Sequence, residues 1–184
     1  MVYMFLADGF EEAEAICPAD LIRRSRTSLT LVSIGKNQEV TGAHGMTLTA
    51  DTTMEKLKKN KHLIDDLEMV IFPGGMPGAK HLDECPDIDW ILSLATEKGA
   101  YIAAICAAPM IPGHRGLLSG HKATCYPSFE DQLEGAEVTD VPVVCDGKFI
   151  TAKAMGAAIP FGLELVRVLC GLDEARKIRE SIFF

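Results

Sequence analysis

The chain has 184 residues, 24% of them charged, and a formal net charge of −8, which suits one globular domain with its own core. The acidic balance, with no basic cluster larger than 56–59, argues against nucleic acid or an anionic membrane as a partner. No apolar run is long enough to span a bilayer, and the short apolar start predicts a strand rather than a signal peptide. We therefore expect a single cytoplasmic domain over residues 1–184.

Strands and helices are predicted to alternate along the chain. The strands are expected at 1–6, 29–34, 67–72, 100–106, 122–125, 141–145 and 149–152, with a small hairpin at 40–48. The helices are expected at 12–25, 54–60, 87–98, shortly after Cys106, at 156–170, and from a cap at Asp173 to about 182. Asp146-Gly147 is a strong hairpin signal between the last two strands.

This alternation predicts an α/β fold, with a mostly parallel sheet covered by helices on both faces. In such sheets ligands bind beyond the carboxyl ends of the strands. Three segments of chemical interest follow predicted strands, namely 7–14, 73–75 and 106–107. We expect these three segments to meet at one edge of the sheet.

Cys106 is the leading candidate for a reactive residue. It ends the apolar run 100–105 and precedes Ala107, Ala108 and Pro109, which is typical of a strand-to-helix junction. The positive end of a helix would favour the thiolate there. The competing interpretation is a packed cysteine, since free cysteine is among the most buried residues.

Gly74 and Gly75 lie in a proline- and glycine-rich loop after the third main strand. Their amides, with that of Ala107, could point at a developing oxyanion. A tight turn without further function is the alternative for Pro73-Gly-Gly.

Glu14 is set among small and apolar residues where it would face the same crevice. If it meets Cys106, the two anions repel and the pair shares a proton, with the carboxyl as its expected holder. Glu11 and Glu12 are assigned instead to the favourable dipole at the start of a helix.

The other cysteines and the histidines give weaker signals. The six cysteines are scattered, so neither disulfides nor zinc are expected, and Cys170 should lie on the buried stripe of a helix. His44 could reach the mouth of the site, from this subunit or from a second one. The remaining histidines are expected on the surface or in solvated loops, namely His62, His81, His114 and His121.

Five segments together resemble the ThiJ/PfpI superfamily, in the branch of the Parkinson's-disease-linked protein deglycase (DJ-one); they are 8–14, 18–24, 72–75, 103–109 and 123–127. The resemblance implies a flavodoxin-like three-layer sandwich and a homodimer. It also implies that Cys106 is an oxidation-sensitive nucleophile, Glu14 its protonated partner, and Gly74, Gly75 and Ala107 the oxyanion site.

The sequence departs from the superfamily pattern at three places. Ala107 stands where peptidase-like members have histidine, which argues against a peptidase. Tyr126 stands where the human-type branch has histidine near the active cysteine, and could offer a hydroxyl instead. The segment 154–157 lacks a threonine that the branch often has, so the substrate pocket is expected to differ.

The resemblance implies a cysteine-dependent enzyme acting on reactive carbonyls, either as a glutathione-independent glyoxalase or as a deglycase of proteins or nucleotides. Neither a metal nor an organic cofactor is expected. The alternative is a non-enzymatic oxidative-stress sensor or redox-regulated chaperone that uses Cys106 oxidation. A thiamine-biosynthesis role has no support, because the chain carries no Walker or dinucleotide phosphate motif.

Overall fold

A computed structural model describes residues 1–184, except for the side chains of Lys61 and Leu63. The strands are β1 (Val2–Leu6), β2 (Leu29–Ser33), β3 (Glu39–Thr41), β4 (Thr47–Thr49), β5 (Thr52–Thr53), β6 (Met69–Phe72), β7 (Tyr101–Ile105), β8 (Lys122–Ala123), β9 (Glu137–Val138), β10 (Val143–Asp146) and β11 (Phe149–Ala152). The helices are α1 (Glu12–Arg24), α2 (Met54–Lys59), α3 (Gly78–Asp83), α4 (Pro86–Lys98), α5 (Met110–Gly113), α6 (Ala158–Cys170) and α7 (Leu172–Ser181), with short 3-10 turns at Lys61–Ile64, Glu130–Gln132 and Met155–Ala157.

The main sheet has seven strands in the order β10-β11-β7-β6-β1-β2-β5. Every neighbouring pair is parallel except β10 and β11, which form the antiparallel hairpin predicted around Asp146-Gly147. The chain runs from β1 outward to β2 and β5, and then returns past β1 to β6, so the direction of strand addition reverses between β1 and β6. That switch point is where a doubly wound sheet leaves a crevice for ligands. The predicted α/β class and mostly parallel sheet are confirmed.

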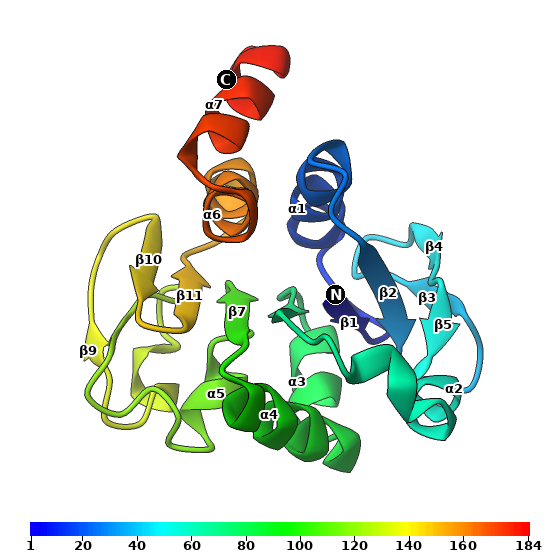
Figure 1. Cartoon of the computed structure of the whole chain (residues 1–184). Coiled ribbons are helices and arrows are strands. Elements are labelled where there is room, and N and C mark those ends of the chain that lie inside the picture. The colour runs from blue at the N-terminus through cyan, green and yellow to red at the C-terminus, as the bar shows by residue number, and fades with distance from the viewer.

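Strand side chains alternate between the two faces of the sheet, and each face builds its own core. Val2, Met4 and Leu6 of β1 pack in the core that includes α1 and α6, whereas Tyr3 and Phe5 pack in the core that includes α3 and α4. Figure 1 shows α1 and α6 on one side of the sheet, with α3, α4 and α5 on the other. Both faces are therefore buried, which explains why the central strands are almost continuously apolar.

The small β3–β4 hairpin is also confirmed, since Val40 pairs with Leu48 in an antiparallel ladder. It stands outside the main sheet, near the start of α1. The Gly42 amide donates to the Met46 carbonyl at 2.8 Å, and the Ala43 amide donates to the Phe10 carbonyl at 2.8 Å. The first bond closes the hairpin turn, and the second holds that turn against the loop that follows β1.

Three sequence predictions about local structure are wrong. The strand predicted at 122–125 is only the two-residue β8, which pairs with β9 in a separate small sheet. Cys170 is exposed because α6 turns a different face to the core, formed by Ala158, Phe161, Gly162, Leu165 and Val166. Asp173 does not cap α7, which begins one residue earlier, after Gly171, and has no side-chain cap.

Candidate active site

The three predicted segments meet at the carboxyl ends of three adjacent strands. Glu14 lies on the first turn of α1 after β1, Gly74 and Gly75 follow β6, and Cys106 follows β7. Because β1, β6 and β7 are neighbours in the sheet, the connections that leave their carboxyl ends lie side by side at the switch point. The expectation that these segments converge is confirmed.

The backbone of Cys106 turns sharply out of β7. Its φ of 66° lies in the left-handed region, which costs a non-glycine residue about 1–3 kcal/mol. Two hydrogen bonds hold it there, from the Cys106 amide to the Ala152 carbonyl at 2.9 Å and from the Tyr126 amide to the Cys106 carbonyl at 2.8 Å. This arrangement resembles the strained turn that lifts a nucleophile above a sheet.

Glu14 and Cys106 are direct partners, and Gly74 lies between their main chains. The Glu14 side chain is 1% exposed, forms a hydrogen bond with the Cys106 side chain, and accepts the Gly74 amide on Oε2 at 3.0 Å. A Cβ at position 74 would lie 2.5 Å from Glu14 Oε2 and 2.6 Å from Cys106 Cβ. Only glycine at this position allows the acid and the thiol to approach each other.

Burial and mutual repulsion oppose ionisation of both groups. Burial, followed by the charge of Glu11, raises the pKa of Glu14 to about 7. Burial, followed by the charge and hydrogen bond of Glu14, raises the pKa of Cys106 to about 12. Between these values the pair holds one proton, and the higher pKa of Cys106 places it on the thiol, so the expectation that the Glu14 carboxyl holds it is corrected. A Cys106 thiolate forms when that proton passes to Glu14.

The sequence expected a helix end to favour the thiolate, and the structure does not bear this out. The helix after Cys106 begins only at Met110 and has four residues. Stabilisation comes instead from the Gly75 and Ala107 amides, whose hydrogen bonds to the sulfur lower its pKa against the effect of burial. Cys106 itself is half-buried rather than sealed in the core.

The predicted oxyanion set therefore divides in two. The Gly75 and Ala107 amides point at the Cys106 sulfur, whereas the Gly74 amide is already committed to Glu14. Gly74 acts on the acid, so its predicted place among the oxyanion donors is corrected. The signal for this division was absent from the sequence, because each amide direction depends on loop geometry.

Tyr126 reaches the site through its main chain. Its amide bonds to the Cys106 carbonyl, while its side chain is 46% exposed and lies edge-on to Phe129, with ring centroids 6.3 Å apart. The role proposed for its hydroxyl thus stays a prediction.

His114 and His121 are tied to other groups and are not freely solvated as predicted. His114 Nδ1 lies 2.8 Å from Asp83 Oδ2, and its Nε2 lies 2.8 Å from Gln132 Oε1. His121 packs on Phe149 with ring centroids 4.7 Å apart. These contacts tie His114 to α3 and His121 to β11, and they give no cysteine–histidine pair with Cys106 among the interactions described.

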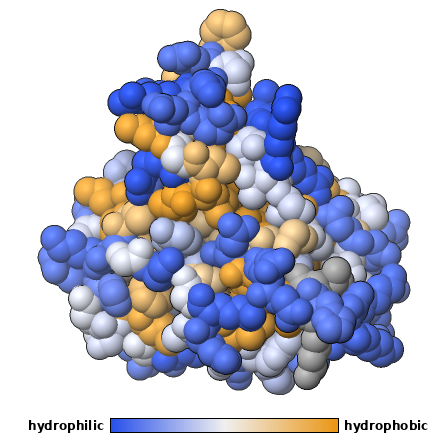
Figure 2. Space-filling model, viewed as in Figure 1, coloured by the Kyte–Doolittle hydropathy of each residue, from blue (hydrophilic) through white to orange (hydrophobic). Residues whose placement is uncertain are grey.

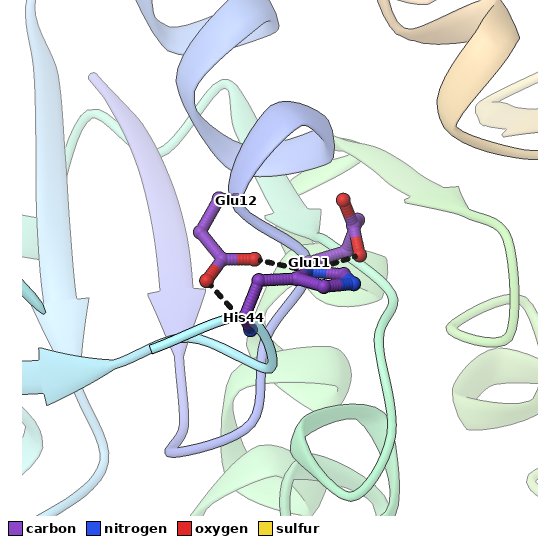
Figure 3. A group of neighbouring side chains, drawn as sticks. All are labelled: Glu11, Glu12 and His44. Atoms are coloured by element: carbon purple, nitrogen blue, oxygen red, sulfur yellow. Dashed lines mark hydrogen bonds and ion pairs between the residues drawn. The ribbon is translucent and has the colours of Figure 1, made fainter. Parts of the chain in front are cut away.

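His44 lies at the turn of the β3–β4 hairpin and meets acids of its own chain. Its Nδ1 is 2.9 Å from Glu12 Oε2 and 3.3 Å from Glu11 Oε2 (Figure 3). Glu12 is 4% exposed, and its Oε1 accepts the amides of His44 at 2.8 Å and Met46 at 3.3 Å. Sequence reasoning missed this linkage, because the two segments are far apart in the chain.

Glu12 is ionised despite its burial. Burial alone would raise its pKa, but the hydrogen bonds from His44 and from the backbone amides outweigh burial and lower it to about 2. Glu12 therefore anchors the hairpin to the start of α1, beyond the dipole role that the sequence assigned to it.

Among the helices of the described part of the chain, none is long and apolar enough to cross a membrane.

Comparison with known proteins agrees with this geometry. The model of the DJ-1/PfpI family matches residues 1–168. The glutathione-independent glyoxalase DJ-1 of Schizosaccharomyces pombe is 27% identical over 186 residues, covering 98% of this chain and 97% of that protein. The DJ-1 homolog B of Arabidopsis thaliana is 32% identical over 175 residues, which are 94% of this chain but only 39% of the relative, so the chain spans about two fifths of that protein.

The solved structure of oxidized Toxoplasma gondii DJ-1 superposes with a TM-score of 0.92 at 29% identity, covering 100% of this chain and 97% of that one. The expected flavodoxin-like architecture is thereby confirmed. With the family model extending over residues 1–168 of 184, this chain belongs to the DJ-1/PfpI family.

Proposed function

We propose that the protein is a cysteine-dependent enzyme that converts small reactive dicarbonyls to hydroxy acids, as a glutathione-independent glyoxalase. The observation that carries this proposal is the direct pairing of a half-buried thiol with a buried acid whose pKa is raised to about 7. A base of that strength suits proton transfer at neutral pH. The Schizosaccharomyces pombe relative, a glutathione-independent glyoxalase, supports the same chemistry.

The first step is addition of the Cys106 thiolate to the aldehyde carbon of a substrate such as methylglyoxal. The sulfur–carbon bond forms while the carbonyl oxygen takes the electron pair, and Glu14 supplies the proton that makes a hemithioacetal. The Gly75 and Ala107 amides lie beside the sulfur, where they can stabilise the charge that passes to the oxygen.

The second step moves hydrogen between adjacent carbons. The Glu14 carboxylate removes the proton from the former aldehyde carbon, and the resulting enediol is reprotonated at the neighbouring carbon. The product is a thioester on Cys106. Water then cleaves the thioester, which releases lactate and restores the thiol. Overall, the dicarbonyl and one water molecule become the hydroxy acid, so no external oxidant or reductant is needed.

A carbonyl panel tests this mechanism. We expect Cys106→Ser to lower kcat/KM for methylglyoxal at least about a thousandfold, because the nucleophile is lost. Cys145→Ser, at an exposed cysteine away from the site, is the matched control and should keep wild-type turnover. Lactate formation at the wild-type rate by the Cys106→Ser protein would refute the mechanism. The loss of early glyoxal adducts from protein or nucleotide is measured with the same variants. It decides whether deglycation uses the same Cys106 mechanism.

A redox-sensing role is the second candidate. The same acid and amides that contact the Cys106 sulfur can hold the oxygens of a sulfinic acid. Mass spectrometry after mild peroxide treatment tests this role. Selective Cys106 oxidation that alters partner binding, without carbonyl turnover, would favour it over the enzyme.

The proposed enzyme acts as a cytoplasmic homodimer. Exposed apolar side chains at Ile16 on α1, and at Leu172 and Phe184 near the end of the chain, support a protein–protein contact. Hydrophobic residues are also visible at the surface around α6 and beside α7 (Figure 2). Sedimentation equilibrium of the full chain measures the oligomeric state, and a monomer at micromolar concentration would remove this part of the proposal.

A further inference from the structure

Glu11, Glu12 and His44 form a group of three donors at the rim of the candidate active site, and each offers one ligand atom within 4.8 Å of the others. Two of them come from the start of α1, and the third comes from the turn between β3 and β4 (Figure 3). We propose that this Glu11–Glu12–His44 group binds one divalent cation of the zinc class. The sequence predicted no metal site, because residues 11 and 44 are far apart in the chain and meet only in the folded protein.

The distances within the group already approach those of a coordination sphere. His44 Nδ1 lies 2.9 Å from Glu12 Oε2 and 3.3 Å from Glu11 Oε2. Two ligands on a tetrahedral zinc ion, with bonds of about 2.1 Å, lie about 3.4 Å apart. A cation can therefore take the place of the hydrogen bond to His44 with small movements of side chains.

The Glu12 carboxylate is fixed by groups outside the donor set. The His44 and Met46 amides bond to Oε1, which leaves Oε2 facing the other two donors. Gly42 packs so closely that a Cβ there would come within 2.4 Å of the carboxylate carbon. Hydrogen bonds and packing of this kind orient the ligands of metal sites before the ion binds.

The group combines negative charge with an open side. Two carboxylates face one imidazole, so the group keeps at least one excess negative charge even when His44 is protonated. The His44 side chain is 65% exposed and Glu11 is 18% exposed, which gives an ion a path in and leaves room for water. Mixed nitrogen and oxygen donors favour zinc or a similar transition metal, because calcium and magnesium take oxygen ligands.

Equilibrium dialysis of the full chain against Zn²⁺ tests the site, with Co²⁺ absorption to identify the ligand atoms. We expect one ion per chain, and a Co²⁺ spectrum without the intense near-ultraviolet bands that thiolate ligands produce. His44→Ala and Glu11→Gln should each weaken Zn²⁺ binding at least about tenfold. His44 is exposed and Glu11 is partly buried, and circular dichroism checks that both variants fold.

The matched control is His62→Ala, which removes an exposed histidine that also lies 3.3 Å from a carboxylate, at Asp65. It should bind Zn²⁺ as the wild type does. The proposal is overturned if the wild type binds no zinc, if both site variants bind it unchanged, if the control loses it equally, or if thiolate bands appear. None of these readouts depends on turnover, so failure here leaves the proposed function untouched.

Discussion

Glu12 and Glu14 lie two residues apart on the first turn of α1, and both are almost completely buried, at 4% and 1% exposed. Their acid strengths nevertheless diverge, with a pKa of about 2 for Glu12 and about 7 for Glu14. Glu12 accepts two backbone amides and faces His44, whereas Glu14 accepts one amide and faces a thiol and the charge of Glu11. Burial alone therefore does not set a pKa; the number and charge of the facing groups decide it.

The pH dependence of turnover should show the largest effect. The proposed mechanism needs the Glu14–Cys106 pair with a single proton, and this form is lost when the pair becomes doubly protonated below about pH 7. We expect kcat/KM to fall about tenfold for each pH unit below that value and to be level above it. Initial rates from about pH 5 to about pH 9, on either side of the Glu14 pKa, measure this pH dependence. A flat profile would contradict the role of Glu14.

Glu14→Gln should change stability in a direction opposite to most core substitutions. The folded-state pKa of Glu14 is raised above its unfolded value, so the protonated acid stabilises the fold at low pH, and this contribution is lost as pH rises through about 7. Above that pH the variant, which cannot ionise, should gain up to about 3 kcal/mol over the wild type. Urea unfolding at about pH 5 and about pH 9, two units on either side of the Glu14 pKa, measures the difference in unfolding free energy between the variant and the wild type. Equal stabilities at the high pH would show that Glu14 is not strained when ionised.

Gly74→Ala should disrupt the Glu14–Cys106 pair by steric overlap. The added Cβ would meet Glu14 Oε2, Cys106 Cβ and the Ile105 carbonyl, so we expect a loss of about 2 kcal/mol in the free energy of unfolding, together with a loss of turnover. Gly35→Ala is the control, because the nearest atom to a Cβ there is Ser33 Oγ at 3.4 Å, an ordinary van der Waals contact. Similar unfolding midpoints and rates for the two variants would argue against the close approach at position 74.

Glu12→Gln should destabilise the protein, in contrast to Glu14→Gln, which should stabilise it above about pH 7. The folded-state pKa of Glu12 is depressed, so its ionised form stabilises the fold above its unfolded value of about 4.5, and this contribution is lost as pH falls toward 2. Replacing the charge weakens the bonds to the hairpin and should cost about 1.5 kcal/mol at neutral pH. Thermal unfolding at pH 7 and pH 3 (on either side of about 4.5) measures this cost. A variant as stable as the wild type at both values would show that the hairpin does not depend on this anion.

Several features were predictable because they depend on neighbours in the chain. The strand ending at Ile105, the stripe on α4 and the Asp146-Gly147 hairpin follow from apolar periodicity and turn residues. The order of elements then implied a parallel sheet, and a parallel sheet places the ends of β1, β6 and β7 together. This argument makes Cys106 and Glu14 candidates at that edge, and the family resemblance implied that they pair.

Other features could not be predicted, because they depend on the directions of single groups. The α6 stripe was misassigned since several of its faces are apolar, and only packing against α1 selects the one that is buried. The division of work among Gly74, Gly75 and Ala107 depends on where each amide points.

The sequence by itself determined the class of fold and the edge of the sheet that carries the chemistry, because these follow from periodicity and the polarity of parallel strands. The pairing of one thiol with one acid was implied by the family resemblance. Only the tertiary structure decided how that pair ionises, and that Glu12 rather than Glu14 faces His44 on the hairpin. The reason is that pKa values and ligand groups depend on distances of a few ångströms between segments that lie far apart in the chain.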